Sequence, residues 1–160
     1  MPYTAQQIAD YIIADSHEAG SFISNLKLQK LLYYAQAWHL AINGEPLFPE
    51  RFQAWVRGPV IPELYRVYKD YGGRNIDREV VRPSLDDATI AFLSEVLDEY
   101  APLDARRLEW LVRREAPWVN ARGREGVESD DPCTAAIDEA EMREYYRGRM
   151  QESRTAGAAS

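Results

Sequence analysis

The residues that could do acid–base, nucleophilic or metal chemistry are few and scattered. The chain has two histidines, His17 and His39, and one cysteine, Cys133. No second histidine follows His17 at the spacing of a zinc-binding HExxH helix, and Cys133 has no histidine near it in sequence to form a thiolate pair. His39 falls among apolar residues, where a hydrogen-bonded core histidine is a better interpretation than a base or a ligand. With no phosphate loop, dinucleotide fingerprint or nucleophile elbow, the sequence predicts no enzyme, no metal and no cofactor.

Arginine is the one charged residue type that gathers locally. Six arginines lie within Arg106–Arg124, at positions 106, 107, 113, 114, 122 and 124. A solvated helix face is the simplest interpretation, and a patch for an acidic partner or for the phosphates of a nucleotide is the alternative. The net charge of −7 argues against non-specific binding to nucleic acid or to an anionic membrane. A helix-turn-helix that uses 104–115 as its basic helix is the less favoured possibility.

Hydrophobic periodicity predicts a mainly α, compact single domain of about six helices. The expected helices cover about 4–14, 25–43, 62–71, 84–100 and 104–115, and a last one opens at 138. Helix 25–43 is apolar on two sides, so it should be buried at the centre. The segment 45–62 holds four prolines, and its alternating pattern at 51–56 predicts at most a small β element near 51–60. Residues 116–118 should stop a helix, 1–150 should form the domain, and 151–160 should be a disordered tail.

Local capping signals set several of these boundaries. Thr4 and Gln7 have the form of a capping box. Ser24 or Asn25 can cap the central helix, and Gly44 can end it. Either Ser84 or Asp86 can cap the helix that ends near 100.

One segment combines aromatic residues with a stiff turn. In Phe52-Gln-Ala-Trp55-Val-Arg57-Gly58-Pro59-Val60, the residue before proline is held in extended backbone and proline donates no hydrogen bond. The turn should therefore place Trp55 and Arg57 in fixed positions. Trp55 either covers the core or forms part of a rigid binding surface, since Trp, Tyr and Arg often dominate interfaces.

These segments resemble the Panacea, or SocA-like, antitoxin domain. The resemblance is carried by SNLKLQKLLYYAQAW at 24–38, by Gly44 and Pro46-Leu-Phe48, and by FQAWVRGPV at 52–60 with Leu64-Tyr65. It continues at Pro117-Trp118 and more loosely at Ile137 and 142–146, and so covers about 4–147. The residues of this pattern that are expected to brace the fold are Leu28, Gln29, Tyr33, Trp38, Gly58, Pro59, Val60 and Trp118.

The resemblance implies an antitoxin of a type II-like toxin–antitoxin pair of bacteria, phages or prophages, without enzymatic activity. Its partner would be a cognate toxin from the adjacent gene, such as an alarmone-synthetase-like enzyme, neutralised by direct binding. The alternative is a proteolytic adaptor that delivers the toxin to an ATP-dependent protease, with the stretch after Arg149 as its second surface. A nucleotide-binding protein that uses Arg106–Arg124 is a third reading. Some relatives carry a helix-turn-helix domain that is not seen here, which speaks against autoregulation.

A toxin-binding surface is expected on the polar flank of the central helix and beside the stiff turn. Its members would be Lys27, Lys30, Tyr34, Trp55, Arg57 and Tyr65, of which Arg57 stands where the family pattern varies. The competing interpretation is that they only brace the fold. The N-terminus does not read as a signal peptide, no apolar run approaches the length of a membrane span, and one cysteine forms no disulfide framework. These features predict a cytoplasmic protein with no membrane partner.

Overall fold

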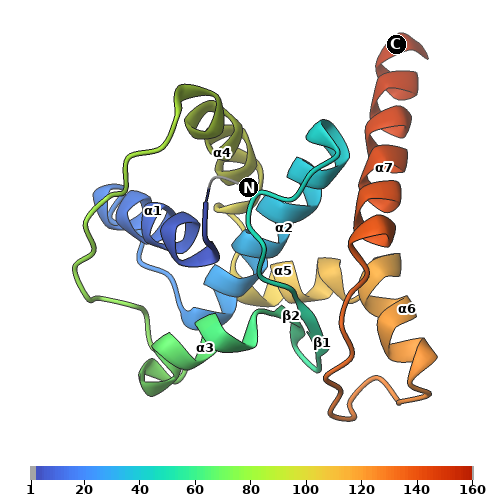
Figure 1. Ribbon diagram of the computed structural model, residues 1–160, viewed down its shortest axis with the longest axis horizontal. Coiled ribbons are helices and arrows are strands. Elements are labelled where there is room, and N and C mark those ends of the chain that lie inside the picture. The colour runs from blue at the N-terminus through green and yellow to red at the C-terminus, as the bar shows by residue number, and fades with distance from the viewer. Residues whose placement is uncertain (1–2, 160) are drawn as a thin grey trace.

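The computed structural model describes the backbone of residues 3–159 and the side chains of residues 3–152. The described part confirms a mainly α fold with one very small sheet (Figure 1). Its elements are α1 (Ala5–Glu18), α2 (Asn25–Asn43), β1 (Gln53–Trp55), β2 (Gly58–Val60), α3 (Pro62–Tyr68), the 3-10 helix η1 (Lys69–Tyr71), α4 (Asp87–Tyr100), α5 (Ala105–Val112), α6 (Ala116–Arg124) and α7 (Glu139–Ala159).

Helix α2 is the central element. It packs against α1, α3, α4, α5, α7 and β2, and Figure 1 shows it in the middle of the molecule, between α1 and α4 on one side and α7 on the other. Leu28 and Leu32, on one side of the helix, and Tyr33, on another side, are all fully buried. The two apolar sides expected from the sequence are therefore explained by neighbours on both sides.

The predicted caps fix the helix boundaries. Thr4 Oγ1 accepts from Gln7 N at 3.1 Å while Gln7 Oε1 accepts from Thr4 N at 2.9 Å, which completes the capping box of α1. Ser24, and not Asn25, caps α2, and Gly44 ends it in the left-handed region with φ +76°. Asp86, and not Ser84, caps α4.

The proline-rich segment after α2 is held by glutamine side chains rather than by regular structure. Gln36 Oε1 accepts from Leu47 N at 2.7 Å, and its Nε2 donates to Phe48 O at 2.8 Å. Gln29 Oε1 accepts from Ile61 N at 3.0 Å. Between these two attachments β1 and β2 form an antiparallel hairpin. Both glutamines are buried, so they supply the backbone partners that prolines leave unmatched.

The last two helices, α6 and α7, differ in part from what the sequence predicts. The prediction that 116–118 stop a helix is wrong, because Pro117 lies in the first turn of α6, where its missing N–H is not needed. Helix α7 begins after Asp138, whose Oδ1 accepts from Ala140 N at 2.7 Å, and its backbone continues to Ala159. Most side chains of 151–160 lie outside the described residues, so the tail and the domain boundary near 150 stay predictions.

Candidate functional site

Three of the six residues expected to bind a partner come together at the hairpin. Trp55 at the end of β1 and Tyr65 on α3 pack edge-to-face, with ring centroids 5.1 Å apart. Arg57 lies in the turn between the strands. They line a cleft of about 300 Å³, here called the hairpin cleft, whose full lining is Leu26, Trp55, Val56, Arg57, Val60, Tyr65, Pro132, Cys133 and Thr134. The cleft is mostly apolar, with the Arg57 guanidinium as its charged group.

The walls of the hairpin cleft are fixed by hydrogen bonds. Trp55 Nε1 donates to Gln53 Oε1 at 2.8 Å, and the Trp55 carbonyl accepts from Trp118 Nε1 at 2.9 Å. Arg57 Nε donates to Glu109 Oε1 on α5 at 2.9 Å, while 58% of the Arg57 side chain remains exposed. The cleft is thus preorganised, and its one cation is held in place yet reachable by a partner.

The expectation that Lys30 and Tyr34 lie on an exposed flank of the central helix is wrong. Both are buried, because β2 and α5 cover Lys30 and α4 covers Tyr34. Tyr34 stacks on Tyr100 with centroids 4.0 Å apart. Neither side chain can touch a partner without opening the core. Their assignment to a binding surface therefore has no support from their position.

Lys30 is unusual even as a core residue. Its Nζ has no hydrogen-bond partner among the described residues. Burial lowers the pKa of Lys30 to about 7. The charge of Glu109 raises this pKa by a smaller amount, and the charge of Arg57 lowers it by a smaller amount. Gly58 lies directly over the lysine, since a Cβ at this position would be 2.6 Å from Lys30 Cε. The Lys30 side chain therefore packs directly against the hairpin at Gly58.

Lys27 is separated from the hairpin cleft. Its Nζ donates to the carbonyl of Ala101 at 2.6 Å, which ties α2 to the end of α4. Desolvation lowers the pKa of Lys27, and Asp104 opposes this effect. The ammonium is half-buried and already bonded, so a bracing role accounts for it.

The residues expected to brace the fold are mostly buried. Leu28, Gln29, Tyr33, Val60 and Trp118 belong to the interior, as do Gly58 and Pro59. Trp38 is half-exposed and donates from Nε1 to Tyr100 Oη at 2.8 Å.

Glu115 is a buried charge that the sequence did not single out. Its Oε1 accepts from Tyr146 Oη at 2.6 Å and from Tyr34 Oη at 3.0 Å, and its Oε2 lies 3.7 Å from Arg149 Nη1. Burial raises the pKa of Glu115, although the tyrosines and Arg149 act in the opposite direction. The residue joins α2 and α7 at the start of α6. Nothing in its local sequence distinguishes it from the exposed carboxylates.

The arginines of 106–124 do not converge on one site. Arg122 is buried and donates to the carbonyls of Ala54 at 2.9 Å and Glu128 at 2.7 Å. Arg124 pairs with Glu141 at 2.7 Å. Arg107 on α5 and Arg114 just after it differ from these, because the guanidinium carbon of each lies 4.4 Å from the ring centroid of Trp110. These arginines therefore do not form a single phosphate-binding cluster.

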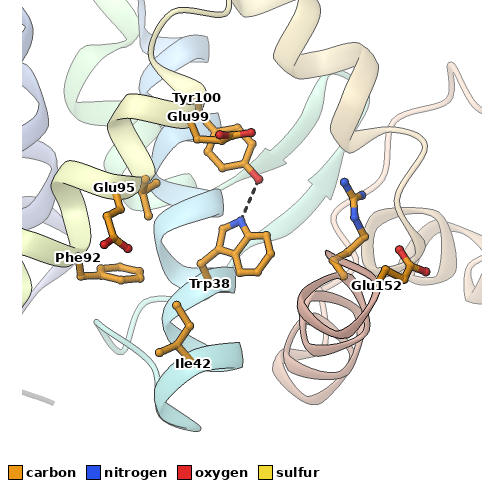
Figure 2. A pocket seen from close by; sticks show the side chains of 9 residues that line it. Trp38, Ile42, Phe92, Glu95, Glu99, Tyr100 and Glu152 are labelled. Atoms are coloured by element: carbon orange, nitrogen blue, oxygen red, sulfur yellow. Dashed lines mark hydrogen bonds between the residues drawn. The ribbon is translucent and has the colours of Figure 1, made fainter. Parts of the chain in front are cut away.

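The two histidines are each bonded to the backbone, and a cavity larger than the hairpin cleft lies elsewhere in the molecule. His17 Nε2 lies 2.9 Å from Ile76 O and His39 Nδ1 lies 2.6 Å from Glu45 O, so a backbone carbonyl occupies one nitrogen of each. A cavity of about 580 Å³ opens between α2, α4 and α7, and Figure 2 shows Trp38 at its centre. In the part of the chain described here, no helix combines the length and apolarity that a bilayer crossing requires.

Comparison with known proteins identifies the family of the chain. Residues 28–119, more than half of the chain, match the family described as Antitoxin SocA-like, Panacea domain. Over 81 residues the chain is 35% identical to Antitoxin SocA of Caulobacter vibrioides, which covers 51% of this chain and 43% of that protein. The chain thus matches less than half the length of this relative. No solved structure matches it.

The family match contains most of the hairpin cleft but not all of it. Helix α2 from Leu28 onward, the hairpin and α3 lie within 28–119, whereas Leu26 and the wall formed by 132–134 lie outside it. The long fixed-order pattern in α2 and the hairpin is what the sequence led us to expect of this family. The chain belongs to the SocA-like antitoxin family and carries its Panacea domain.

Proposed function

We propose that the protein is an antitoxin that neutralises a cognate toxin by binding it directly through the hairpin cleft. The observation that carries the proposal is the preorganised group of Trp55, Arg57 and Tyr65 around an open apolar cleft, in a chain of this family. Trp, Tyr and Arg supply large contact areas and directional hydrogen bonds at low entropic cost.

The size of the cleft sets the extent of the interface. A volume of about 300 Å³ accommodates an inserted side chain but not a whole interface. A stable complex needs on the order of 800 Å² from each partner, so contacts should spread from the cleft to α3 and to 132–134. The wall at 132–134 is where this chain could differ from its relatives in partner choice, because it lies outside the family match.

Charge favours a toxin with a basic surface around an apolar projection. The net charge of −7 would steer such a partner toward the antitoxin. Arg57 and Glu109 offer a cation and a carboxylate side by side at the edge of the cleft. Neutralisation would follow either from occlusion of the toxin's active site or from holding the toxin in an inactive conformation.

The test is co-expression with the adjacent open reading frame. The neighbour alone should stop growth, and this protein should restore growth and co-purify with it. Trp55→Ala and Arg57→Ala should each weaken co-purification, whereas Lys69→Ala, a matched loss of one exposed cation on η1, should not. Binding that survives both cleft variants would place the interface elsewhere. A harmless neighbour that does not bind would refute the antitoxin proposal itself.

A proteolytic adaptor is the alternative, and α7 is the feature that favours it. An adaptor needs a second surface for the protease, and Arg149 and Glu152 of α7 line the larger cavity, away from the hairpin cleft. If α7 serves this purpose, ending the chain at Gly148 should stabilise the toxin against degradation while leaving binding intact. Degradation that persists in the truncated form would remove α7 from this role.

A further inference from the structure

The cavity between α2, α4 and α7 has the lining of a binding site rather than of a packing defect. Its lining, here called the acidic groove, consists of Trp38, Ile42, Phe92, Glu95, Val96, Glu99, Tyr100, Arg149 and Glu152. Its volume of about 580 Å³ lies within the range typical of ligand pockets. Within the described residues it shares no lining residue with the hairpin cleft.

The floor and sides of the groove are apolar and aromatic. Trp38 and Tyr100 both line the groove and are joined by the hydrogen bond from Trp38 Nε1 to Tyr100 Oη, and Phe92 lies near them on α4 (Figure 2). One face of the Tyr100 ring is covered by Tyr34, which stacks on it. Ile42, in the last turn of α2, is 51% exposed. A large exposed apolar residue beside fixed aromatic rings marks a surface that is suited to a partner.

The charge of the groove is negative. Among the residues whose side chains are described, Glu95, Glu99 and Glu152 form no ion pair. Among the lining residues that the structure describes, the cation is Arg149, which lies 3.7 Å from the buried Glu115 carboxylate and donates to Tyr145 Oη at 3.4 Å, so its charge is already shared. The negative charge comes from these carboxylates and not from the helix ends, because Lys27 Nζ donates to Ala101 O at 2.6 Å at the end of α4 and Arg147 Nε donates to Ala41 O at 3.0 Å near the end of α2.

We propose that the acidic groove docks a basic segment of a partner protein, with an arginine inserted beside the aromatic rings and an apolar side chain placed against Ile42. A guanidinium can stack on an indole or phenol ring and at the same time donate two parallel hydrogen bonds to a carboxylate. Trp38 and Tyr100 supply the rings, and Glu95 and Glu99 supply carboxylates one helical turn apart on α4. Anionic ligands such as nucleotides are repelled by the same carboxylates.

The experiment measures anisotropy of a labelled synthetic peptide that carries arginine and leucine at helical spacing. The comparison peptide has glutamate in place of each arginine. The wild-type protein should bind the arginine peptide saturably and not the glutamate peptide. The combined change Glu95→Gln and Glu99→Gln should weaken binding about tenfold, as expected for loss of close charge pairs. Asp98→Asn removes one charge from the same helix outside the groove and should change affinity by less than about twofold.

Three outcomes would overturn the proposal. Equal weakening per charge removed, in Asp98→Asn and in the combined Glu95→Gln and Glu99→Gln variant, would show that only net charge attracts the peptide. Absence of saturable binding would show that the groove is not a docking site for basic segments. Binding of spermidine without binding of the peptide would reassign the groove to small organic cations. Because the probe is not the toxin and Trp55→Ala should leave its binding unchanged, these outcomes are independent of the proposed function.

Discussion

Replacing Lys30 with methionine is expected to stabilise the fold at neutral and acidic pH. The ammonium group of Lys30 is buried without a hydrogen-bond partner among the described residues, and burial lowers its pKa to about 7. Methionine is similarly long and flexible but carries no charge, so it can fill the space under Gly58 without the desolvation penalty. The gain in the free energy of unfolding should be larger at low pH than at high pH, because the pKa of Lys30 is lowered in the folded state.

The magnitude follows from the difference between the folded and unfolded states. A lysine whose pKa is lower in the folded state than in the unfolded state destabilises the fold at every pH at which the lysine of the unfolded chain is protonated. This penalty shrinks as the pH rises from the folded-state pKa to the unfolded-state pKa. Between about 7 and the ordinary value of 10.5, at about 1.36 kcal/mol per pKa unit, the full penalty is about 5 kcal/mol at low pH. From pH 6 to pH 9 it should fall by about 3 kcal/mol.

Urea unfolding of the wild type and of Lys30→Met at pH 6 and pH 9 provides the assay. The difference in unfolding free energy between the two proteins should shrink by about 3 kcal/mol from pH 6 to pH 9, since the contributions of the other groups cancel. Lys69→Met, at an exposed position, should show a difference that does not vary with pH. A constant difference, or a Lys30→Met protein that is less stable than wild type at pH 6, would refute the reasoning.

Three further changes test other parts of the core. Gly58→Ala should lower the free energy of unfolding in urea by about 2–4 kcal/mol, because φ at this position is +116° and the new Cβ would meet the Lys30 side chain. Adding Lys30→Ala to this variant should relieve only part of the loss. Arg122→Ala leaves buried carbonyls unpaired and should lower the unfolding free energy by about 3 kcal/mol and speed proteolysis near Glu128. Since burial raises the pKa of Glu115, wild-type stability should fall as pH rises through that pKa, and Glu115→Gln should remove this decline in a pH series.

Local signals in the sequence predict the helices well. The capping box at Thr4, the N-cap at Ser24 and the left-handed Gly44 all act within a few residues of chain, so they can be recognised without knowledge of the rest of the fold. The same reasoning fails at Pro117, because a proline that could stop a helix instead lies in the first turn of α6, after α5 has already ended at Val112.

The candidate binding surface is only half predictable from the sequence, because the burial of a side chain depends on contacts distant in sequence. Trp55 and Tyr65 meet through the stiff turn and a short helix, which the sequence makes visible. Lys30 looks exposed by residue type, yet the hairpin and α5 cover it. No sequence pattern indicates that Cys133 forms part of the cleft wall. Cys133 lies in a loop whose position depends on contacts with segments more than sixty residues away. One of these contacts is the hydrogen bond that Ile137 N donates to Phe52 O at 2.9 Å.

The glutamine attachments of the proline-rich segment have a consequence for the order of folding. Leu47 N, Phe48 O and Ile61 N find their partners on the side chains of Gln36 and Gln29, which are in place only once α2 has formed. Closing these contacts before the helix exists would restrict the chain without any compensating bond. We therefore expect helix α2 to form first and the hairpin to assemble on it. A newly synthesised chain would acquire its Trp55 surface only after the nucleus around α2 has condensed.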